Sequence, residues 1–436
     1  MTCNDIYYHL YPLGFLGAED RNPHLHSDDG SVTHRLADLH RWLDYFVELG
    51  VTSLLLGPVF ESETHGYDLV DPFRVDRRLG DESDLVAFID ACHQRGLKVA
   101  LDMVFNHVGR GHPYFQDVLQ HGRDSKRCSW FHLDFDQPGY DGFSYENFEG
   151  IGQLVKLNHA NAEVLDWAVR VAGYWMDRGV DAFRLDAAYA IPGRFLAEFS
   201  DQVRAERSDL LLIGEVIHGD YVSIVESSGL GAATQYELWK AIWSALNDRN
   251  FFELAHALER HSDFCEHFLP WTFVGNHDTT RIATRLSDSR HLPQAVALLF
   301  VIPGLPAVYA GDELGVKGTK YEREGGDDEI RRPLPIDPED RDAGKPLAWQ
   351  HHRQLIEMRR SRPWLQRGSL RVTQLANRTI TLEVRGDQDV LVAAFNTDDQ
   401  SASCEVAGDK KLIAGQTVSP TTTELPPHGW AIWSSN

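Results

Sequence analysis

Helix-like segments of this chain repeatedly end in a glycine that is followed at once by a short apolar strand. The clearest examples are Gly50, Gly96 and Gly179, each of which precedes a run rich in leucine or β-branched residues. Glycine readily adopts the left-handed conformation that ends a helix, and a short turn into a strand fits behind it. Because helices that alternate with fully apolar strands are typical of parallel βαβ units, the pattern predicts an α/β fold.

Eight such strands can be placed along the chain, which is the number that closes a (β/α)8 TIM barrel. We expect them at residues 6–15, 51–59, 97–105, 181–186, 210–216, 232–236, 271–275 and 305–309. Between residues 108 and 155 this rhythm gives way to glycine, proline, histidine, aspartate and aromatic residues. A connection of this length predicts a small irregular subdomain inserted after the third strand.

The character of the sequence changes again after residue 367. Short β-rich segments separated by turn residues, at 371–374, 379–384, 390–395 and 430–434, predict a small antiparallel β-sandwich. A chain of 436 residues is long enough for one large domain and a smaller one. The domains that we expect are a catalytic barrel at residues 1–107 and 156–367, an inserted subdomain at 108–155, and a C-terminal domain at 368–436.

The composition limits the partners and the location of the protein. A formal net charge of −23 would repel nucleic acids and anionic membranes. No apolar run is long enough to span a bilayer, and no secretory leader precedes the first strand. Five scattered cysteines without a CxxC pair indicate free thiols and argue against a disulfide framework or a cysteine-based zinc site. We therefore expect a cytoplasmic protein that binds neither nucleic acid nor membranes, and a homodimer is left open.

Carboxylic acids follow three of the predicted strands at their C-terminal ends: Asp186, Glu215 and Asp278. In a barrel of parallel strands these ends carry the active site, so we expect the three side chains to converge. Carboxylates in one cleft repel one another's ionisation, which raises the pKa of at least one of them. Such a group is suited to acid–base and nucleophilic chemistry on a glycosidic bond.

Each of these acids, taken alone, has a simpler interpretation. An aspartate at a strand end is more often a helix cap or a loop anchor than a catalytic group. The chain also has 21 histidines, so a single histidine is more often a packing or surface residue than a ligand. Only the motifs that surround these residues favour a functional role.

Four segments resemble the signature segments of the α-amylase superfamily (glycoside hydrolase family 13), and they occur in the family's order. They read DMVFNH at residues 102–107, GVDAFRLD at 179–186, GEV at 214–216 and FVGNHD at 273–278. Three further segments match as well: HGYD at 65–68, KLN at 156–158 and GLPAVYAGDE at 304–313. Seven matches in one order are hard to attribute to chance, although each alone would be weak.

The resemblance implies a retaining hydrolase of α-glucosides that works through a covalent glycosyl–enzyme intermediate. By position, Asp186 matches the nucleophile, Glu215 the general acid and base, and Asp278 the group that stabilises the transition state. In retaining enzymes the nucleophile and the acid lie about 5 to 5.5 Å apart, so that the nucleophile reaches the sugar directly. The acid must keep its proton near neutral pH, which burial and neighbouring carboxylates can achieve.

Four further residues are expected to bind substrate. Arg184 lies two residues before the nucleophile on the same strand, so both side chains share one face, and its guanidinium would keep the carboxylate ionised and aimed. The resemblance assigns His107 and His277 to hydroxyls of the sugar being cleaved, and Tyr67 to the platform on which that sugar stacks. Asp102 is expected to hold its neighbours in place.

Departures from the family pattern bear on the substrate. Many starch-degrading members carry a Lys-His pair shortly after the nucleophile, whereas residues 187–190 here read Ala-Ala-Tyr-Ala. Ile217 stands where an aromatic residue often follows the acid, and Lys156-Leu-Asn158 resembles the cyclomaltodextrinase and neopullulanase branch. These features favour short, branched or cyclic maltooligosaccharides, with α-1,4 bonds as the expected target and α-1,6 bonds left open.

Other functions remain open at this point. A transglycosylase would use the same residues, with a sugar hydroxyl in place of water. A metal-dependent barrel enzyme would bind magnesium through its strand-end carboxylates, but Arg184 already places a cation there. A catalytically inactive sugar-binding protein is disfavoured because all three acids are present. We expect no cofactor: Asn106 occupies a position that supports calcium in many secreted members, but no complete set of oxygen ligands can be assembled.

Overall fold

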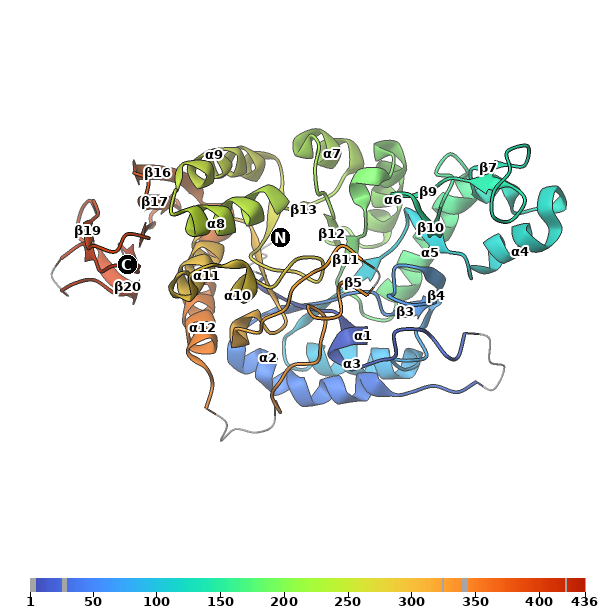
Figure 1. Ribbon diagram of the computed structural model, residues 1–436, viewed down its shortest axis with the longest axis horizontal. Coiled ribbons are helices and arrows are strands. Elements are labelled where there is room, and N and C mark those ends of the chain that lie inside the picture. The colour runs from blue at the N-terminus through green and yellow to red at the C-terminus, as the bar shows by residue number, and fades with distance from the viewer. Residues whose placement is uncertain (1–4, 26–29, 324, 339–343, 420–421, 436) are drawn as a thin grey trace. The chain divides into compact units, whose positions relative to one another are not determined.

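The computed structural model describes residues 5–25, 30–323, 325–338, 344–419 and 422–435. Eight strands form a closed barrel with the hydrogen-bonded order β1-β15-β14-β13-β12-β11-β5-β2 (Figure 1). Their bounds are Tyr7–Leu10 (β1), Ser53–Leu56 (β2), Lys98–Met103 (β5), Ala182–Leu185 (β11), Leu211–Gly214 (β12), Ala232–Thr234 (β13), Leu269–Phe273 (β14) and Leu305–Tyr309 (β15). The predicted (β/α)8 fold is confirmed.

Six of the eight predicted strands are shorter than expected, and for the first and the sixth the reason is local. The first ends at Leu10 because Pro12 starts a short helix, α1 (Pro12–Phe15), where the fixed φ of proline suits the first helical position. The sixth ends at Thr234 because α8 (Tyr236–Asp248) begins there, with the Gln235 side chain accepting a hydrogen bond from the Leu238 N–H. The sequence ranges 6–15 and 232–236 were therefore wrong at their C-terminal ends.

The glycines that ended the predicted helices adopt the left-handed conformation. Their φ angles are +96° at Gly50, +73° at Gly96 and +93° at Gly179. Each is followed by a barrel strand, β2, β5 and β11 respectively. The predicted pattern, in which a glycine ends a helix and a strand follows, is therefore confirmed at these three places.

The chain divides into two compact units. One comprises residues 10–43 and 53–232, and the other comprises residues 1–9, 44–52 and 233–436. Helices of the first unit are α3 (Glu82–His93), α4 (Pro113–His121), α5 (Ala162–Met176), α6 (Gly193–Glu206) and α7 (Tyr221–Ser228). Helices of the second are α8, α9 (Phe252–His267), α10 (Ile282–Arg285), α11 (Leu292–Val301) and α12 (Leu347–Arg360), and α2 (Leu43–Leu49) lies in it except for its first residue.

The predicted insert contains a small sheet of its own within the first unit. Three antiparallel strands pair in the order β6 (His107–Gly109), β10 (Ile151–Lys156) and β9 (Asn147–Phe148). A second pair is formed by β7 (Leu133–Asp134) and β8 (Ser144–Tyr145), and another hairpin, β3 (Phe60–Ser62) with β4 (Leu69–Val75), precedes α3. We keep residues 108–155 as the proposed limits of the insert.

The C-terminal segment forms an antiparallel sheet domain, as expected. Five strands pair in the order β16 (Ser369–Leu375), β17 (Thr379–Arg385), β18 (Val390–Asn396), β22 (Trp430–Ser434) and β20 (Lys411–Gly415). A second, two-stranded sheet is formed by β19 (Ala402–Ser403) and β21 (Glu424–Leu425). Buried side chains from both sheets make one apolar cluster, which includes Val392, Cys404, Leu425 and Trp433.

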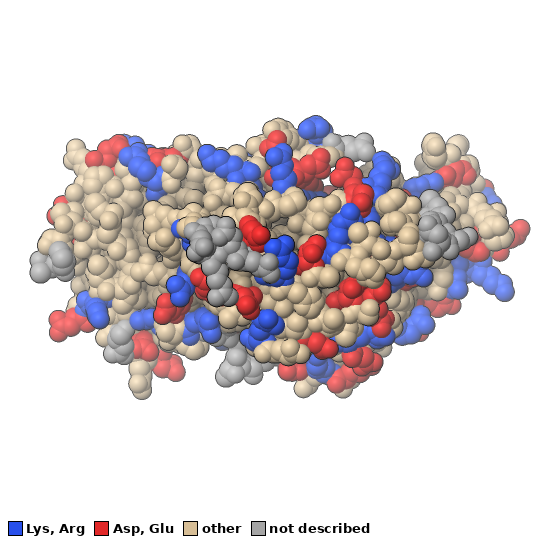
Figure 2. All heavy atoms as spheres, turned by 90° about the horizontal axis from the view of Figure 1, so that it is seen from below, with Lys and Arg blue, Asp and Glu red and all other residues tan. Residues whose placement is uncertain are grey.

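Cysteine usage agrees with the sequence analysis where the structure describes it. Cys92, Cys128, Cys265 and Cys404 are free thiols, and Cys3 lies outside the described residues. On the face drawn in Figure 2, acidic and basic side chains are interspersed. Within the described part of the chain, no helix combines the length and the apolar character that a membrane span requires.

Candidate active site

Arg184 binds three buried carboxylates in the first compact unit. Its Nη1 lies 2.6 Å from Asp102 Oδ2 and 3.3 Å from Asp186 Oδ1, and its Nη2 lies 2.6 Å from Glu215 Oε1. All four side chains are buried, with 7% or less of each residue exposed. A planar guanidinium suits this task because it offers several fixed donors to separate acids.

The barrel strands explain why these side chains meet. Arg184 on β11 lies directly beside Asp102 on β5 in the parallel register, so the two side chains point to the same face. The ladder continues past the strand ends, where the Asp186 N–H donates to the Met103 carbonyl and the Glu215 N–H donates to the Leu185 carbonyl. The sheet backbone therefore fixes the positions from which both acids project.

Burial and charge act against each other on the groups of this cluster. Burial raises the pKa of Asp102 above its usual value, although Arg184 acts in the opposite direction. For Arg184, burial alone would lower the pKa, but the carboxylates of Asp102 and Glu215 outweigh burial and raise it well above the ordinary value. The guanidinium therefore stays charged. Asp102, whose pKa is raised, is not one of the three strand-end acids that we expected to converge, and we expected it to be structural.

Tyr67 belongs to the same network. Its hydroxyl donates a hydrogen bond of 3.1 Å to Asp102 Oδ2, and the residue is 9% exposed. Asp102 thereby joins Tyr67 to Arg184, which agrees with the expectation that it holds its neighbours in place. An aromatic ring fixed in this way can present one face to the apolar surface of a sugar.

His107 is a neutral, buried histidine with one ring nitrogen available. Burial lowers its pKa to about 3. The ring stacks on Phe148 of the insert, with centroids 5.0 Å apart and 15° between the planes. Its Nε2 has no hydrogen-bond partner among the described residues. This nitrogen could therefore bind a substrate hydroxyl.

Two contacts beside the acids were not found by sequence reasoning. The Ala187 N–H donates a 2.9 Å hydrogen bond to Glu215 Oε2, and Ala187 has a left-handed backbone with φ of +47°. The Tyr189 hydroxyl donates a 2.6 Å hydrogen bond to Glu149 Oε1 in the insert. The first is a backbone contact, which the residue type does not reveal. The second joins positions 40 residues apart in the sequence.

Tyr189 also lies among aromatic rings. The centroid of its ring lies 4.9 Å from that of His218 and 6.4 Å from that of Phe148. This residue is one of the four that stand in place of the Lys-His segment of starch-degrading members. The position therefore supplies an aromatic surface and a link to the insert, where a lysine would supply a charge.

His277 and Asp278 lie in the second compact unit, directly after β14, and they contact each other. His277 Nε2 is 3.1 Å from Asp278 Oδ2, and Arg331 Nη2 is 2.9 Å from Asp278 Oδ1. The Arg331 Nε–H also donates to the His277 carbonyl at 2.9 Å. Arg331 was not identified from the sequence because it lies in an irregular segment 53 residues beyond the acid that it contacts.

The segment that follows β15 has a structural role in the same unit. Glu313 is fully buried and accepts hydrogen bonds of 2.8 Å from the hydroxyls of Tyr8 and Tyr45. Asp312 lies 3.2 Å from Arg281 Nη1, and burial raises the pKa of its carboxyl to about 6. These acids are occupied by buried partners, which explains the motif at residues 304–313 without a catalytic role.

The structure joins some of the predicted site residues directly. Tyr67, Arg184, Asp186 and Glu215 are linked through contacts around Asp102, and His107 lies in the same unit. His277 and Asp278 contact each other in the other unit. The predicted roles of these seven residues remain proposals.

Calcium finds little support around Asn106. The buried Oδ1 atom of Asn106 has no hydrogen-bond partner among the described residues, so it would be available to bind a cation. Calcium needs six to eight oxygen ligands, however. Among the described residues, only two groups of three or more acidic, histidine or cysteine side chains lie close enough to share an ion, and neither contains a residue near Asn106. We assign no calcium site there.

Comparison with protein families and known proteins gives a consistent result. A family model described as "Alpha amylase, catalytic domain" matches residues 26–371. Among curated proteins, a cyclomaltodextrinase of Geobacillus thermopakistaniensis is 30% identical over 415 residues, which is 90% of this chain and 68% of that protein. A maltogenic α-amylase of Bacillus acidopullulyticus is 31% identical over 384 residues, which is 83% of this chain and 63% of that protein.

Solved structures of similar length superpose on the whole chain. A cyclic α-maltosyl-(1→6)-maltose hydrolase from Arthrobacter globiformis has a TM-score of 0.83 and 26% identity, and the match covers 100% of this chain and 99% of that one. A debranching enzyme from Nostoc punctiforme has a TM-score of 0.82 and 25% identity, with 99% and 98% of the two chains covered. The likeness therefore includes the insert and the C-terminal domain.

Proposed function

Because this chain belongs to the α-amylase family of glycoside hydrolases, we propose that it hydrolyses α-glucosidic bonds in short, branched or cyclic maltooligosaccharides with retention of configuration. The observation that carries the proposal is the buried Arg184, which contacts both Asp186 and Glu215. A retaining mechanism needs two acids at one site, and a fixed guanidinium that contacts both holds them in place beside each other.

In the proposed reaction, Asp186 attacks the anomeric carbon while Glu215 gives its proton to the leaving oxygen. The covalent glycosyl–enzyme is then hydrolysed by a water molecule from which Glu215 takes a proton. Asp278 stabilises the oxocarbenium-like transition state. Its carboxylate is oriented by His277 and Arg331, which suits a group that acts by fixed charge.

The binding residues act on the sugar that is being cleaved. Tyr67 is fixed by Asp102 and offers a ring for stacking. The buried Nε2 of His107 offers a hydrogen bond to a hydroxyl, and His277 is proposed to do the same. Groups that are already in place before binding lose little entropy when the substrate arrives, so more of the binding energy remains for the reaction.

The substrate class rests on the chain's own substitutions together with its relatives. The absence of a Lys-His pair after the nucleophile removes charged contacts that bind long glucans in starch-degrading members. The cyclomaltodextrinase, the maltogenic amylase and the cyclic maltosyl-maltose hydrolase are named for small or cyclic substrates or for a small product. We propose the same class here. The reaction itself requires no cofactor. In the cytoplasm the enzyme would meet oligosaccharides that the cell has imported.

The product profile tests this proposal. Purified protein is incubated with linear maltooligosaccharides, with panose, and with cyclic substrates that include both cyclomaltodextrins and cyclic maltosyl-maltose. Opening of a cyclic or branched substrate faster than cleavage of long glucans is expected, with the product released first as the α-anomer. Release of the β-anomer would contradict the retaining mechanism, and equal cleavage of long glucans would contradict the substrate class. Longer or isomeric products at high substrate concentration would indicate transfer to sugar hydroxyls.

A further inference from the structure

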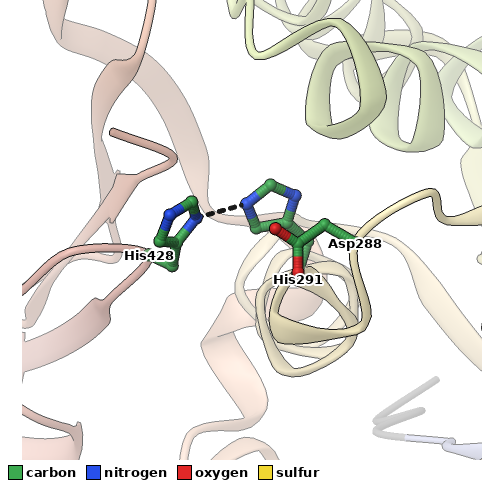
Figure 3. A group of neighbouring side chains, drawn as sticks. All are labelled: Asp288, His291 and His428. Carbon is green, nitrogen blue, oxygen red and sulfur yellow. Dashed lines mark hydrogen bonds between the residues drawn. The ribbon is translucent and has the colours of Figure 1, made fainter. Parts of the chain in front are cut away.

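Three side chains meet at the junction between α11 and the C-terminal sheet domain, within one compact unit. Asp288 caps the start of a short 3-10 turn (Ser289–His291) that runs directly into α11, and His291 is the last residue of this turn. His428 lies two residues before β22. Each offers a ligand atom within 4.8 Å of the other two, and Figure 3 shows the three converging. His291 is 1% exposed and His428 is 7% exposed.

The outer partner of His428 fixes its orientation. His428 Nε2 lies 2.8 Å from Asp399 Oδ1, and Arg249 Nη2 donates to the other oxygen of Asp399 at 2.8 Å. Asp399, paired in this way with the Arg249 guanidinium, accepts the Nε2 proton of His428. The Nδ1 lone pair of His428 then points inward. Histidines that bind metals are held in this way by a carboxylate.

His291 is buried and only partly satisfied by hydrogen bonds. Only 1% of the residue is exposed. Its Nε2 lies 2.9 Å from His428 Nδ1, but its Nδ1 has no hydrogen-bond partner among the described residues. The Nε2 atom, which faces His428, is therefore the nitrogen of this ring that could bind an ion.

We propose that Asp288, His291 and His428 form a binding site for a divalent transition metal, with Zn²⁺ as the best match. Two imidazole nitrogens and one carboxylate oxygen, with water as the fourth ligand, are a donor set that zinc accepts, whereas magnesium and calcium prefer oxygen alone. At Zn–N distances of about 2.0–2.1 Å, a tetrahedral ion needs the two nitrogens roughly 3.3 Å apart. The present separation of 2.9 Å has to open by only a few tenths of an ångström.

The position of the site indicates a structural role. Asp288 and His291 precede α11, and His428 precedes β22, which lies between β18 and β20 in the C-terminal sheet. An ion bound by all three would fasten the two elements together, beside the direct hydrogen bonds from Gln294 Nε2 to the carbonyls of Asn396 and His428. An ion that binds only the folded state stabilises it.

A second group of metal-binding residues provides the control. His34, Asp81 and Asp84 also lie within ligand distance of one another. Asp81 and Asp84, however, form the capping box at the start of α3, and His34 is a largely exposed partner of Asp84 at 2.6 Å. Asp288 likewise caps its own turn and pairs with Arg290. The two groups differ in their histidines, because His34 is exposed whereas His291 and His428 are buried. His34→Gln should therefore leave zinc binding at the junction intact.

The test is a zinc titration of chelator-treated protein, followed by isothermal calorimetry and by competition with a chromogenic chelator. The wild type should bind one equivalent tightly, above weak binding by the other surface histidines. His428→Gln and Asp288→Asn should lose this equivalent, whereas His34→Gln should keep it. Asp399→Asn, which removes only the outer carboxylate, should weaken the affinity about 10- to 100-fold.

The folded state is checked by thermal melting in chelator. Asp288 and Asp399 are partly exposed, so their asparagine variants should fold even if His428→Gln does not. Zinc should raise the melting temperature of the wild type and of His34→Gln, but not that of Asp288→Asn. The absence of a tight equivalent in the wild type, or its retention in Asp288→Asn and unchanged affinity in Asp399→Asn, would overturn the proposal.

Discussion

Arg184 places one buried positive charge against three acids, those of Asp102, Asp186 and Glu215. If all three acids were ionised, the cluster would carry a net charge of its own in a site of low polarity, which is costly. Burial offsets this by raising the pKa of Asp102. The raised pKa makes Asp102 the acid of this cluster that takes up a proton more readily than usual, which reduces the excess negative charge beside Arg184.

Replacing the proposed nucleophile should separate chemistry from stability. Asp186→Asn removes the attacking oxygen, and we expect kcat to fall on the order of 10⁴-fold or more. The fold should survive because Arg184 keeps Asp102 and Glu215 as partners. Initial rates on a maltooligosaccharide and the melting temperature check this. Asp102→Asn is the matched control, since it removes an acid from the same cation without removing the nucleophile, and equal activity of Asp186→Asn and wild type would disprove the mechanism.

The hydroxyl of Tyr189 should hold the insert close to the turn that follows the nucleophile. Tyr189→Phe removes the hydrogen bond to Glu149, which is worth about 1 kcal/mol and corresponds to roughly fivefold faster opening. We therefore expect faster amide hydrogen exchange at residues 147–150, measured by mass spectrometry. Tyr140→Phe, at an exposed tyrosine of the same insert, should leave these amides unchanged. Unaltered exchange in Tyr189→Phe would show that other contacts hold this segment.

At the scale of elements, one glycine determines how α11 connects to β15. Gly304 has a φ of +114°, and a Cβ at this position would lie 2.4 Å from the Pro270 carbonyl oxygen. Gly304→Ala should therefore cost roughly 3 kcal/mol, from left-handed strain together with overpacking. Gly96→Ala has a similar strain, with a φ of +73°, but no atom within 4 Å, so it should cost only about 1 kcal/mol. Urea denaturation of both variants measures the difference, and equal losses would refute the steric argument.

The barrel could be predicted from the sequence because each of its strands is indicated by a pattern of neighbouring residues. Each strand is a short apolar run, and glycines such as Gly50 and Gly179 mark the turns that precede them. The errors arose where one local signal overrode another, as at Pro12, which starts a helix inside an apolar run. The course of the insert could not be predicted in detail, because its short strands pair through tertiary contacts and carry no periodic pattern.

The candidate site was predictable only in part, for the same reason. Arg184 and Asp186 alternate on one strand, so their shared face follows from the sequence. The hydrogen bond from the Ala187 backbone to Glu215 and the contact of Arg331 with Asp278 depend on how distant segments meet. Motifs indicated the acids, but the residues that orient the acids required the three-dimensional structure.

At the scale of the whole molecule, buried neutral histidines should make the fold sensitive to acid. Burial lowers the pKa to about 3 for His107 and His112, and to about 4 for His159, His261 and His352. Groups with a depressed folded-state pKa stabilise the fold above their unfolded pKa of about 6.5, and this stabilisation is lost as the pH falls towards the folded value. One pH unit below 6.5, each such histidine costs about 1.4 kcal/mol.

Three buried acids act in the opposite direction. Burial raises the pKa of Asp312 to about 6 and also raises that of Asp102 and Glu313, so these groups favour the folded state as the pH falls towards the unfolded value of about 4. Five histidines should outweigh three acids. We expect the melting temperature to fall between pH 7 and pH 5, with a shallower fall in His352→Gln than in the exposed control His256→Gln. A melting temperature that is constant or rises over this range would contradict the argument.

The strand order also bears on how the protein is made. In the C-terminal sheet, β22 is the last strand in the sequence, yet it pairs with β18 on one side and β20 on the other. In the barrel, β1 pairs with β15, about 300 residues later. During synthesis on the ribosome, neither sheet can therefore complete its pairing until a late segment has emerged. Until then the apolar faces and strand edges of both sheets are exposed. The nascent chain therefore depends on chaperones, or on rapid folding once synthesis is complete, to avoid aggregation.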